Sequence, residues 1–209
     1  MRKIVKTRQP REWTRYCCTP GVDYQACPEL RKVLLNDQGY ICAYCTRSLD
    51  EMGNNTKIEH IKTRNKNQDQ KLKYRNMVIC CNGVTKGFRH CDTSKDRDDI
   101  SFDLLTDSFF KTLSYGSGSG IIKSSNATWD DEINRYLHLN NDYLRHERIE
   151  IINSIIEVLG KKEDWNTEKQ KLRRLRKIWN EKDARGHYKP YCGLVVYFLT
   201  KRLDRANKN

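Results

Sequence analysis

Four cysteines in the first half of the chain have a spacing that suits a metal site. Cys42 and Cys45 form a C-x-x-C hook, and Cys81 and Cys91 follow at positions where they can close it. Four thiolates around one ion are a common ligand set for structural zinc, which binds in a tetrahedral arrangement. The sequence therefore predicts a zinc ion that holds together segments far apart along the chain.

A second group of reactive side chains lies between these cysteines and directly after them. It comprises a carboxylate, an imidazole, an amide and a second carboxylate, from Glu59, His60, Asn76 and Asp92. Such groups can hold a hard divalent ion and activate a water beside it, as hydrolysis of a phosphodiester requires. The imidazole suits the base, because its unperturbed pKa of about 6.5 leaves it largely neutral at pH 7. Adjacent strand residues point to opposite faces, which at first argues against a site shared by Glu59 and His60.

The charge of the chain favours a polyanionic partner. Among 209 residues, Lys and Arg number 40 against 27 Asp and Glu, for a formal net charge of +13. Four zinc-bound thiolates and one zinc ion would change this charge by −4 and +2, which leaves +11. Nucleic acid is the usual partner for such an excess, but a basic surface also occurs without one, so charge alone does not decide.

Nine cysteines are many for a cytoplasmic enzyme unless several of them bind metal. No apolar run follows the basic start of the chain, so no signal peptide is expected, and no apolar stretch is long enough to span a membrane. We therefore expect a cytoplasmic protein without membrane contact, whose reduced thiols favour zinc over disulfides. Cys17, Cys18 and Cys27 fit no zinc pattern and are interpreted as free thiols.

Hydrophobic periodicity and turn residues place the reactive groups on a small unit of helices and strands. The predicted elements are a helix at 28–39, strands at 57–61 and 77–80, and a helix at 92–99. Pro28 suits the first turn of the first helix, and Gly39 suits its end. The first strand carries the Glu-His pair, and the second leads into Cys81.

Four parts are predicted along the chain. They are an extended N-terminal arm at 1–28, a zinc-bound core at 29–114, a flexible connector at 115–126 and a mainly helical region at 127–209. The connector prediction depends on alternating Gly and Ser, and the helical region on apolar residues at helical spacing. Its histidines, His138, His146 and His187, lack partners at metal spacing and are interpreted as surface or packing residues.

The stretch from Cys42 to Lys95 resembles the HNH nucleases, whose active site is a ββα-metal fold. The pattern is closest to the HNH proteins of retron systems and of Septu anti-phage defence, which show C-A-Y-C, E-H-I-K, an Asn, S-C-N-G and H-C-x-x-K in this order. The corresponding stretches here are C-A-Y-C, E-H-I-K, N-M-V-I-C-C-N-G and H-C-D-T-S-K. A second match, L-H-L-N at 137–140 followed by Leu144 and Arg148, extends the resemblance over residues 30–160.

The resemblance implies an α+β fold with a ββα-metal (HNH) core, a zinc site of four cysteines and a mainly α-helical C-terminal region. His60 would be the base, and Asn76 would orient it. Glu59 and Asp92 would hold one Mg²⁺ or Mn²⁺, and a local twist of the strand would let Glu59 and His60 both contribute. The residues expected to contact nucleic acid are Lys62, Arg64 and Lys95, with support of the fold as the alternative role of Lys95.

Two of these assignments have a rival nearby. Cys81 is preferred to Cys80 as the zinc ligand, because the dipeptide N-G follows it as in the family pattern. Asp92 stands where HNH proteins more often have Asn or His, which makes His90 the rival ligand of the catalytic ion.

The expected function is a metal-dependent HNH endonuclease of a bacterial anti-phage defence system, with DNA as the expected substrate and RNA as the alternative. The resemblance implies an ATPase partner subunit of the Septu type, or a complex with a retron reverse transcriptase, for which the helical region would be the docking surface. The main alternative is a zinc-stabilised nucleic-acid-binding subunit without catalysis, which explains the charge and the cysteines but not the reactive side chains in family order. A third possibility is a structural subunit with a nuclease-like fold.

Overall fold

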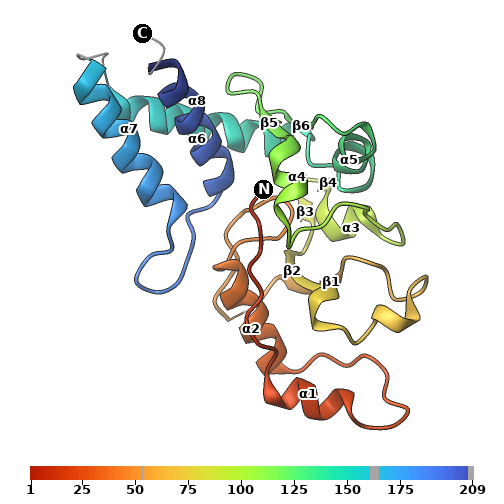
Figure 1. Cartoon of the computed structure of the whole chain (residues 1–209). Helices are drawn as coiled ribbons and strands as arrows, with labels where there is room; N and C mark the ends of the chain where they lie inside the picture. Colours follow the sequence, from red (N-terminus) through yellow and green to blue (C-terminus); the bar gives the residue numbers. More distant parts are fainter. Residues whose placement is uncertain (53, 161–164, 207–209) are drawn as a thin grey trace.

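Small antiparallel sheets lie among helices in this protein (Figure 1). The computed structural model describes residues 1–52, 54–160 and 165–206. Within these residues the strands form three separate two-stranded sheets, and the second half of the chain is mostly helical. The predicted α+β class is therefore confirmed. No helix in the described ranges combines the length and the apolar character that a membrane crossing needs.

The N-terminal segment contains one helix, α1 (Arg11–Cys17), and an irregular stretch that leads to α2 (Pro28–Gln38). The prediction of an extended arm at 1–28 is wrong for α1, whose residues are helical where Trp13 packs into the core and is completely buried. α2 begins where predicted and ends before Gly39, which has the left-handed conformation (φ 60°) that favours glycine.

The central unit consists of two strands and a short helix. β1 (Thr56–His60) and β2 (Met77–Cys81) pair antiparallel, with His60 opposite Met77. α3 (Cys91–Lys95) and α2 both pack against β2, whose residues are all buried. β2 is therefore the centre around which this unit is built.

Short elements fill the connections of the central unit. They are 3₁₀ turns at Gln68–Gln70 and Tyr74–Asn76, and a hairpin of β3 (Val84–Thr85) and β4 (Phe88–Arg89). The helix predicted to continue to about Asp99 ends at Lys95, because Asp96 has a positive φ of 49° that breaks helical geometry.

A β-hairpin occupies the stretch predicted as a flexible connector at 115–126. α4 (Asp107–Thr112) leads into β5 (Leu113–Tyr115), which pairs with β6 (Ile122–Ser124). A Cβ added at Gly120 would lie 2.2 Å from a backbone oxygen of the helix that follows, so only glycine allows this close approach. Of the two forms expected for the Gly-Ser stretch, a turn or a short linker, the structure shows the turn, which joins β5 to β6.

The C-terminal region is helical, as the apolar periodicity predicts. Its elements are α5 (Ala127–Asp131), a π-helical turn (Glu132–Tyr136), α6 (Asp142–Leu159), α7 (Trp165–Asn180) and α8 (Cys192–Ala206). α7 and α8 pack along each other, and α6 packs against both. Their shared core consists of Ile155, Leu159, Leu172, Val195, Leu199 and Leu203. Residues 161–164 and 207–209 of the predicted region lie outside the described residues.

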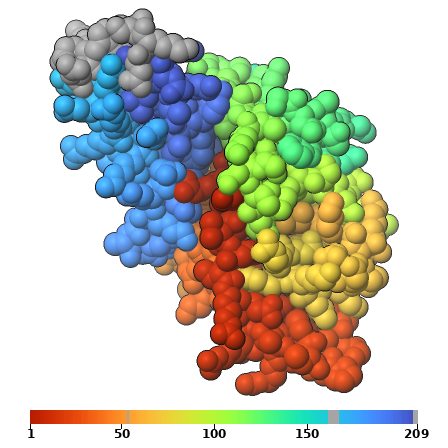
Figure 2. All heavy atoms as spheres, viewed as in Figure 1, coloured from red at the N-terminus to blue at the C-terminus, as the bar shows by residue number. Residues whose placement is uncertain are grey.

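The main hydrophobic core joins the N-terminal segment, the central strands and the hairpin. It extends from Trp13 through Met77 in β2 to Phe109 and Leu144. Figure 1 shows α7 and α8 on one side of the molecule and the β1–β2 pair on the other. In Figure 2 the first residues of the chain (red) run along the surface between these two parts. The reactive side chains of the central unit therefore lie apart from α7.

Candidate functional site

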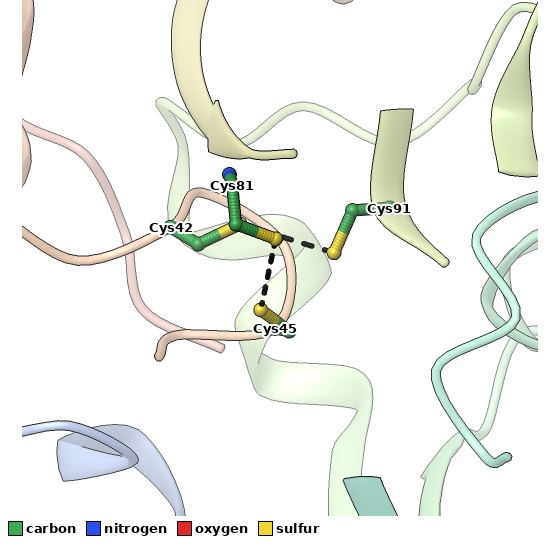
Figure 3. A group of neighbouring side chains, drawn as sticks. All are labelled: Cys42, Cys45, Cys81 and Cys91. Carbon is green, nitrogen blue, oxygen red and sulfur yellow. Dashed lines mark hydrogen bonds between the residues drawn. The ribbon is translucent and has the colours of Figure 1, made fainter. Parts of the chain in front are cut away.

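The four cysteines selected from the sequence lie together in the structure. Cys42, Cys45, Cys81 and Cys91 are all buried, and their sulfur atoms lie within 4.8 Å of one another. Figure 3 shows these side chains turned toward a common centre. The Cys42–Cys91 and Cys45–Cys81 sulfur pairs are each 3.8 Å apart. Sulfurs about 2.3 Å from a central ion form a tetrahedron with edges of about 3.8 Å, so the cluster has the dimensions of a zinc site.

The choice between the two neighbouring cysteines of β2 agrees with this geometry. Cys81 belongs to the cluster of four, and its backbone N–H lies 3.5 Å from the Cys42 sulfur. Cys80 is also fully buried but is not one of the four, and burial raises the pKa of its thiol. Cys80 is therefore a packing residue of the strand.

A chain of hydrogen bonds reaches the cysteine cluster from outside. Arg47 donates to the hydroxyl of Thr85 (2.7 Å), whose own proton is then free for Nε2 of His90 (3.1 Å). When Cys91 is a thiolate, which only accepts, Nδ1 of His90 donates to its sulfur (3.1 Å). The fully buried His90 thus serves the cysteines rather than the carboxylates. Nothing in the sequence pointed to Arg47 or Thr85.

Glu59 lies buried beside an ammonium group. Its Oε1 is 2.7 Å from Nζ of Lys95 and accepts a hydrogen bond from the Tyr44 hydroxyl (3.3 Å). Lys95 is itself fully buried and also donates to the backbone oxygen of His60 (3.3 Å). This placement contradicts the prediction that Lys95 contacts nucleic acid, because solvent cannot reach its ammonium. It agrees with the alternative, in which Lys95 supports the fold.

Asp92 is the second carboxylate of this cluster. It lies within hydrogen-bonding reach of Glu59 and forms an ion pair with Lys57 (3.5 Å). Burial, and then the neighbouring Asp92, raise the pKa of Glu59 to about 8, although Lys95 opposes the shift. A second negative charge here is therefore unfavourable without further positive charge. The donors are two carboxylates, which fit a hard ion such as Mg²⁺, whereas among the described residues only the cysteines form a group of three or more metal donors.

One ring nitrogen of His60 is held by a hydrogen bond, and the other is unpaired among the described residues. Nε2 lies 2.9 Å from the backbone oxygen of Lys71, and because a carbonyl only accepts, Nε2 carries the proton. Nδ1 has no hydrogen-bond partner among the described residues, and His60 as a whole is 5 % exposed. Burial of most of the ring lowers the pKa of His60 to about 4. At neutral pH the imidazole therefore offers an unprotonated nitrogen.

Asn76 fixes the loop that holds His60. Its side-chain oxygen accepts from the backbone N–H of Lys62 (2.8 Å), and its amide donates to the backbone oxygens of Lys62 (2.9 Å) and Gln70 (3.2 Å). Both ends of the loop that bears the Lys71 carbonyl are thereby tied together. Asn76 is thus a positioning residue that acts on His60 through this loop.

The two predicted nucleic-acid contacts that follow β1 differ in exposure. Arg64 is exposed, and its guanidinium lies 4.8 Å from the ring centre of Tyr24. Lys62 is half-buried and donates to the backbone oxygen of Ile100 (2.7 Å). Arg64 is therefore available to a ligand near His60, whereas the ammonium of Lys62 is engaged within the fold.

The N-terminal segment contributes residues that the sequence did not suggest. The ring of Tyr24 meets His60 edge-on, with centroids 4.6 Å apart, and packs against Trp13 on its other side at 6.1 Å. Asp23 pairs with the side chain of Lys71 (2.9 Å), whose backbone oxygen holds the imidazole. Neither the composition nor the spacing of residues 1–28 signals these contacts.

The structure does not bring Glu59 and His60 into one cluster of side chains. Glu59 points toward Tyr44, Asp92 and Lys95, whereas His60 points toward Tyr24 and the loop after β1. No hydrogen bond joins the two side chains in the part of the chain that the structure describes. The expected local twist is therefore not visible as a direct contact.

A comparison with models of known protein families finds none that matches this chain. A comparison with curated proteins finds no match either.

We predict one tightly bound metal ion per chain, with zinc as the ion. Cys81→Ser should lose it and lower the melting temperature sharply, because the binding of a structural metal is part of the folding free energy. Cys80→Ser should keep the metal, since Cys80 is not one of the four ligands. Elemental analysis and thermal melts measure both effects. Well-folded metal-free protein, or metal loss only in Cys80→Ser, would contradict the site.

We predict that the His60 imidazole stays neutral, with its proton on Nε2, until the pH falls toward about 4. The pKa of His60 is lowered because burial penalises the charged imidazolium. A pH far below 6.5 is therefore needed to protonate the ring. Nitrogen-15 and proton NMR of histidine-labelled protein measures both the tautomer and the midpoint. His60→Gln assigns the signal, and a midpoint near 6.5 would refute the buried, anchored ring.

Proposed function

We propose that this protein is a metal-dependent endonuclease of the HNH class that hydrolyses phosphodiester bonds, with DNA as its expected substrate. The observation that carries the proposal is the state of His60, a neutral imidazole with one nitrogen anchored and the other without a hydrogen-bond partner among the described residues. A general base needs an unprotonated atom at a fixed position. His60 supplies such an atom at Nδ1.

The surroundings of His60 support this role. Asn76 and Lys71 fix the ring through the loop after β1, and Tyr24 packs against its edge. A preorganised base loses less rate to misplacement than a mobile one. Arg64, exposed beside Tyr24, is placed to attract a phosphate toward this position.

The two carboxylates would hold the catalytic ion. Glu59 and Asp92 offer hard oxygen donors that suit Mg²⁺ or Mn²⁺. When bound, such an ion supplies positive charge at the phosphate and at the leaving oxygen. The raised pKa of Glu59 means that an ion would have to displace its proton. Lys95, whose Nζ lies 2.7 Å from Oε1 of Glu59, keeps this carboxyl group in place in either protonation state.

The cysteine cluster would hold a structural zinc ion, separate from the chemistry. It lies among buried residues and ties the turn after α2 to the end of β2 and to the start of α3. Four thiolates leave no open coordination position on zinc, which is typical of structural rather than catalytic sites.

The biological setting of the proposal comes from the resemblance in the sequence. It is an anti-phage defence system of the Septu or retron type in the bacterial cytoplasm, with an ATPase subunit or a retron reverse transcriptase complex as partner. The ordered motifs between Cys42 and Lys95 are what supports it.

A zinc-stabilised nucleic-acid-binding subunit without catalysis is the second candidate. It is favoured by the ion pair of Lys95 with Glu59, which partly meets the demand for positive charge without a metal ion. The direction of Glu59 away from His60 also favours it. Cleavage with and without added Mg²⁺ distinguishes the two candidates.

We predict that His60→Ala lowers the rate of DNA cleavage by a factor of about 10² to 10⁴, the usual contribution of a general base. Affinity for the same DNA should change little, because it comes from many basic contacts rather than from one imidazole. Single-turnover cleavage and fluorescence anisotropy measure the two effects. His146→Ala, at an exposed histidine of α6, is the matched control and should cut at the parent rate. An unchanged rate in His60→Ala would eliminate the proposed base.

We predict different defects for the two residues that flank Cys91. Asp92→Ala should lose cleavage, with partial recovery at raised Mg²⁺ or Mn²⁺, because one of two carboxylate donors is removed. His90→Ala should retain cleavage but lose zinc faster to a chelator, because Cys91 loses its hydrogen-bond donor. Cleavage rates and a colorimetric zinc-release assay provide the measurements. The reverse pattern would make His90 the ligand of the catalytic ion.

A further inference from the structure

The helix α7 carries a dense group of positive charges on its exposed side. Its exposed basic residues are Lys171, Arg173, Arg174, Arg176 and Lys177. The opposite side of the helix buries Leu172 in the core shared with α6 and α8. Figure 1 shows α7 at the edge of the molecule, with β1 and β2 on the other side. These charges are therefore displayed to solvent apart from His60.

Acidic residues do not neutralise this surface. In the described part of the chain, Arg173, Arg174, Arg176 and Lys177 take part in no ion pair. The acidic residue in the first turns of the helix, Glu168, is buried and paired with an arginine of α8 (2.9 Å). The positive charge of these four residues is thus left for a ligand.

The face is hollowed where α7 meets α8. A groove of about 450 Å³ lies there, lined by Arg173, Arg176, Lys177 and Asn180 from α7, by Val196 and Thr200 from α8, and by Glu181. Three of these seven residues carry a positive charge and one carries a negative charge. Such a groove suits an anionic chain better than an apolar one.

The lysines around the candidate site are largely used within the fold, in contrast to those of α7. Lys62 donates to a backbone oxygen, Lys95 pairs with Glu59, and Lys71 pairs with Asp23. Of the three residues predicted to contact nucleic acid, only Arg64 is exposed. Part of the positive charge near the site is thus engaged within the fold, and α7 offers a second surface for a polyanion.

The density of charge on α7 matches that of nucleic acid. Residues 171–177 span about 9 Å at the rise of an α-helix. Duplex DNA presents one phosphate charge per about 1.7 Å of its axis, so about five phosphates face this length. Guanidinium groups bind phosphate oxygens in pairs, which favours the arginines found here.

A surface that binds a protein partner is expected to have a different composition. The centres of protein interfaces are depleted in charged residues and enriched in aromatic and apolar ones. Along the described exposed face of α7 the large apolar side chain is Ile178, which is 43 % exposed. The composition of the face thus favours nucleic acid over an acidic protein.

We propose that the basic face of α7 binds the phosphate backbone of nucleic acid, as a contact surface separate from the His60 site. This binding does not depend on whether His60 catalyses hydrolysis. It assigns to the helical region a role in holding the nucleic acid in addition to any docking of a partner subunit.

The test compares two variants of the full chain that each lose four positive charges. The first carries Arg173→Gln, Arg174→Gln, Arg176→Gln and Lys177→Gln. The matched control removes exposed charges scattered over other elements, with Arg11→Gln, Arg97→Gln, Lys111→Gln and Lys123→Gln. Anisotropy with a labelled DNA duplex, over a salt series without added divalent ions, gives the affinity and its salt dependence, and thermal melts confirm folding.

We predict that the α7 variant binds the duplex at least tenfold more weakly and that its log–log salt slope falls by about 3 to 4, because four phosphate contacts are lost. The control should lose less than about threefold. Equal losses in both variants, or an unchanged α7 variant, would overturn the proposal.

A footprint on the unaltered chain provides a second measurement that does not depend on how the variants fold. Phenylglyoxal modifies accessible arginines, and mass spectrometry locates the modified residues. The duplex should protect Arg173, Arg174 and Arg176, whereas poly-glutamate at equal charge should not. Absence of protection by DNA, or equal protection by poly-glutamate, would overturn the assignment to nucleic acid.

Discussion

The gathering of Cys42, Cys45, Cys81 and Cys91 is the constraint on which the central unit depends. The four buried sulfurs come from the turn after α2, from the end of β2 and from the start of α3. Burial raises the pKa of the Cys45 and Cys91 thiols, so buried thiolates need a positive ion among them. α3 has only five residues, and Cys91 at its start has a φ of 54°, which non-glycine residues rarely adopt. Such a short helix requires attachment at this residue.

The attachment of α3 and β2 at the cysteines sets the positions of Glu59, Asp92 and His60. α3 carries Asp92 and Lys95 to the buried carboxylate of Glu59, and β2 holds β1 in register through Thr56 opposite Cys81. Asn76 then closes the loop between the strands. The imidazole is therefore fixed through this loop and the two strands, and not by direct contact with the cysteines. Substitution of a cysteine should therefore shift these groups through the strands and α3 rather than through any direct contact.

Sequence reasoning succeeded where a local pattern carries the information. The thiolate spacing selected the four clustered cysteines, and the apolar periodicity with Pro28 and Gly39 located the helices. Sequence reasoning failed where contacts between distant segments determine the local structure. Trp13 of α1 packs into the core, the backbone of α6 pins Gly120, and the carboxylate of Glu59 draws Lys95 into the core. The approach of Tyr24 to His60 likewise joins segments with no common motif, so no spacing rule could reveal it.

The two carboxylates differ in how a metal ion from solvent could reach them. Glu59 is buried, and Lys95, which contacts it, is also held by the backbone oxygen of His60. Asp92 keeps about a fifth of its side chain exposed, and its partner Lys57 is a half-exposed side chain at a distance of 3.5 Å. An exposed pair of this kind is weak and exchanges readily, whereas breaking the buried pair leaves an uncompensated charge. Asp92 is therefore the carboxylate that would be available to a divalent ion once Lys57 moves aside. Glu59 would have to be ionised to hold the same ion, and Lys95, 2.7 Å from its Oε1, would then balance its charge.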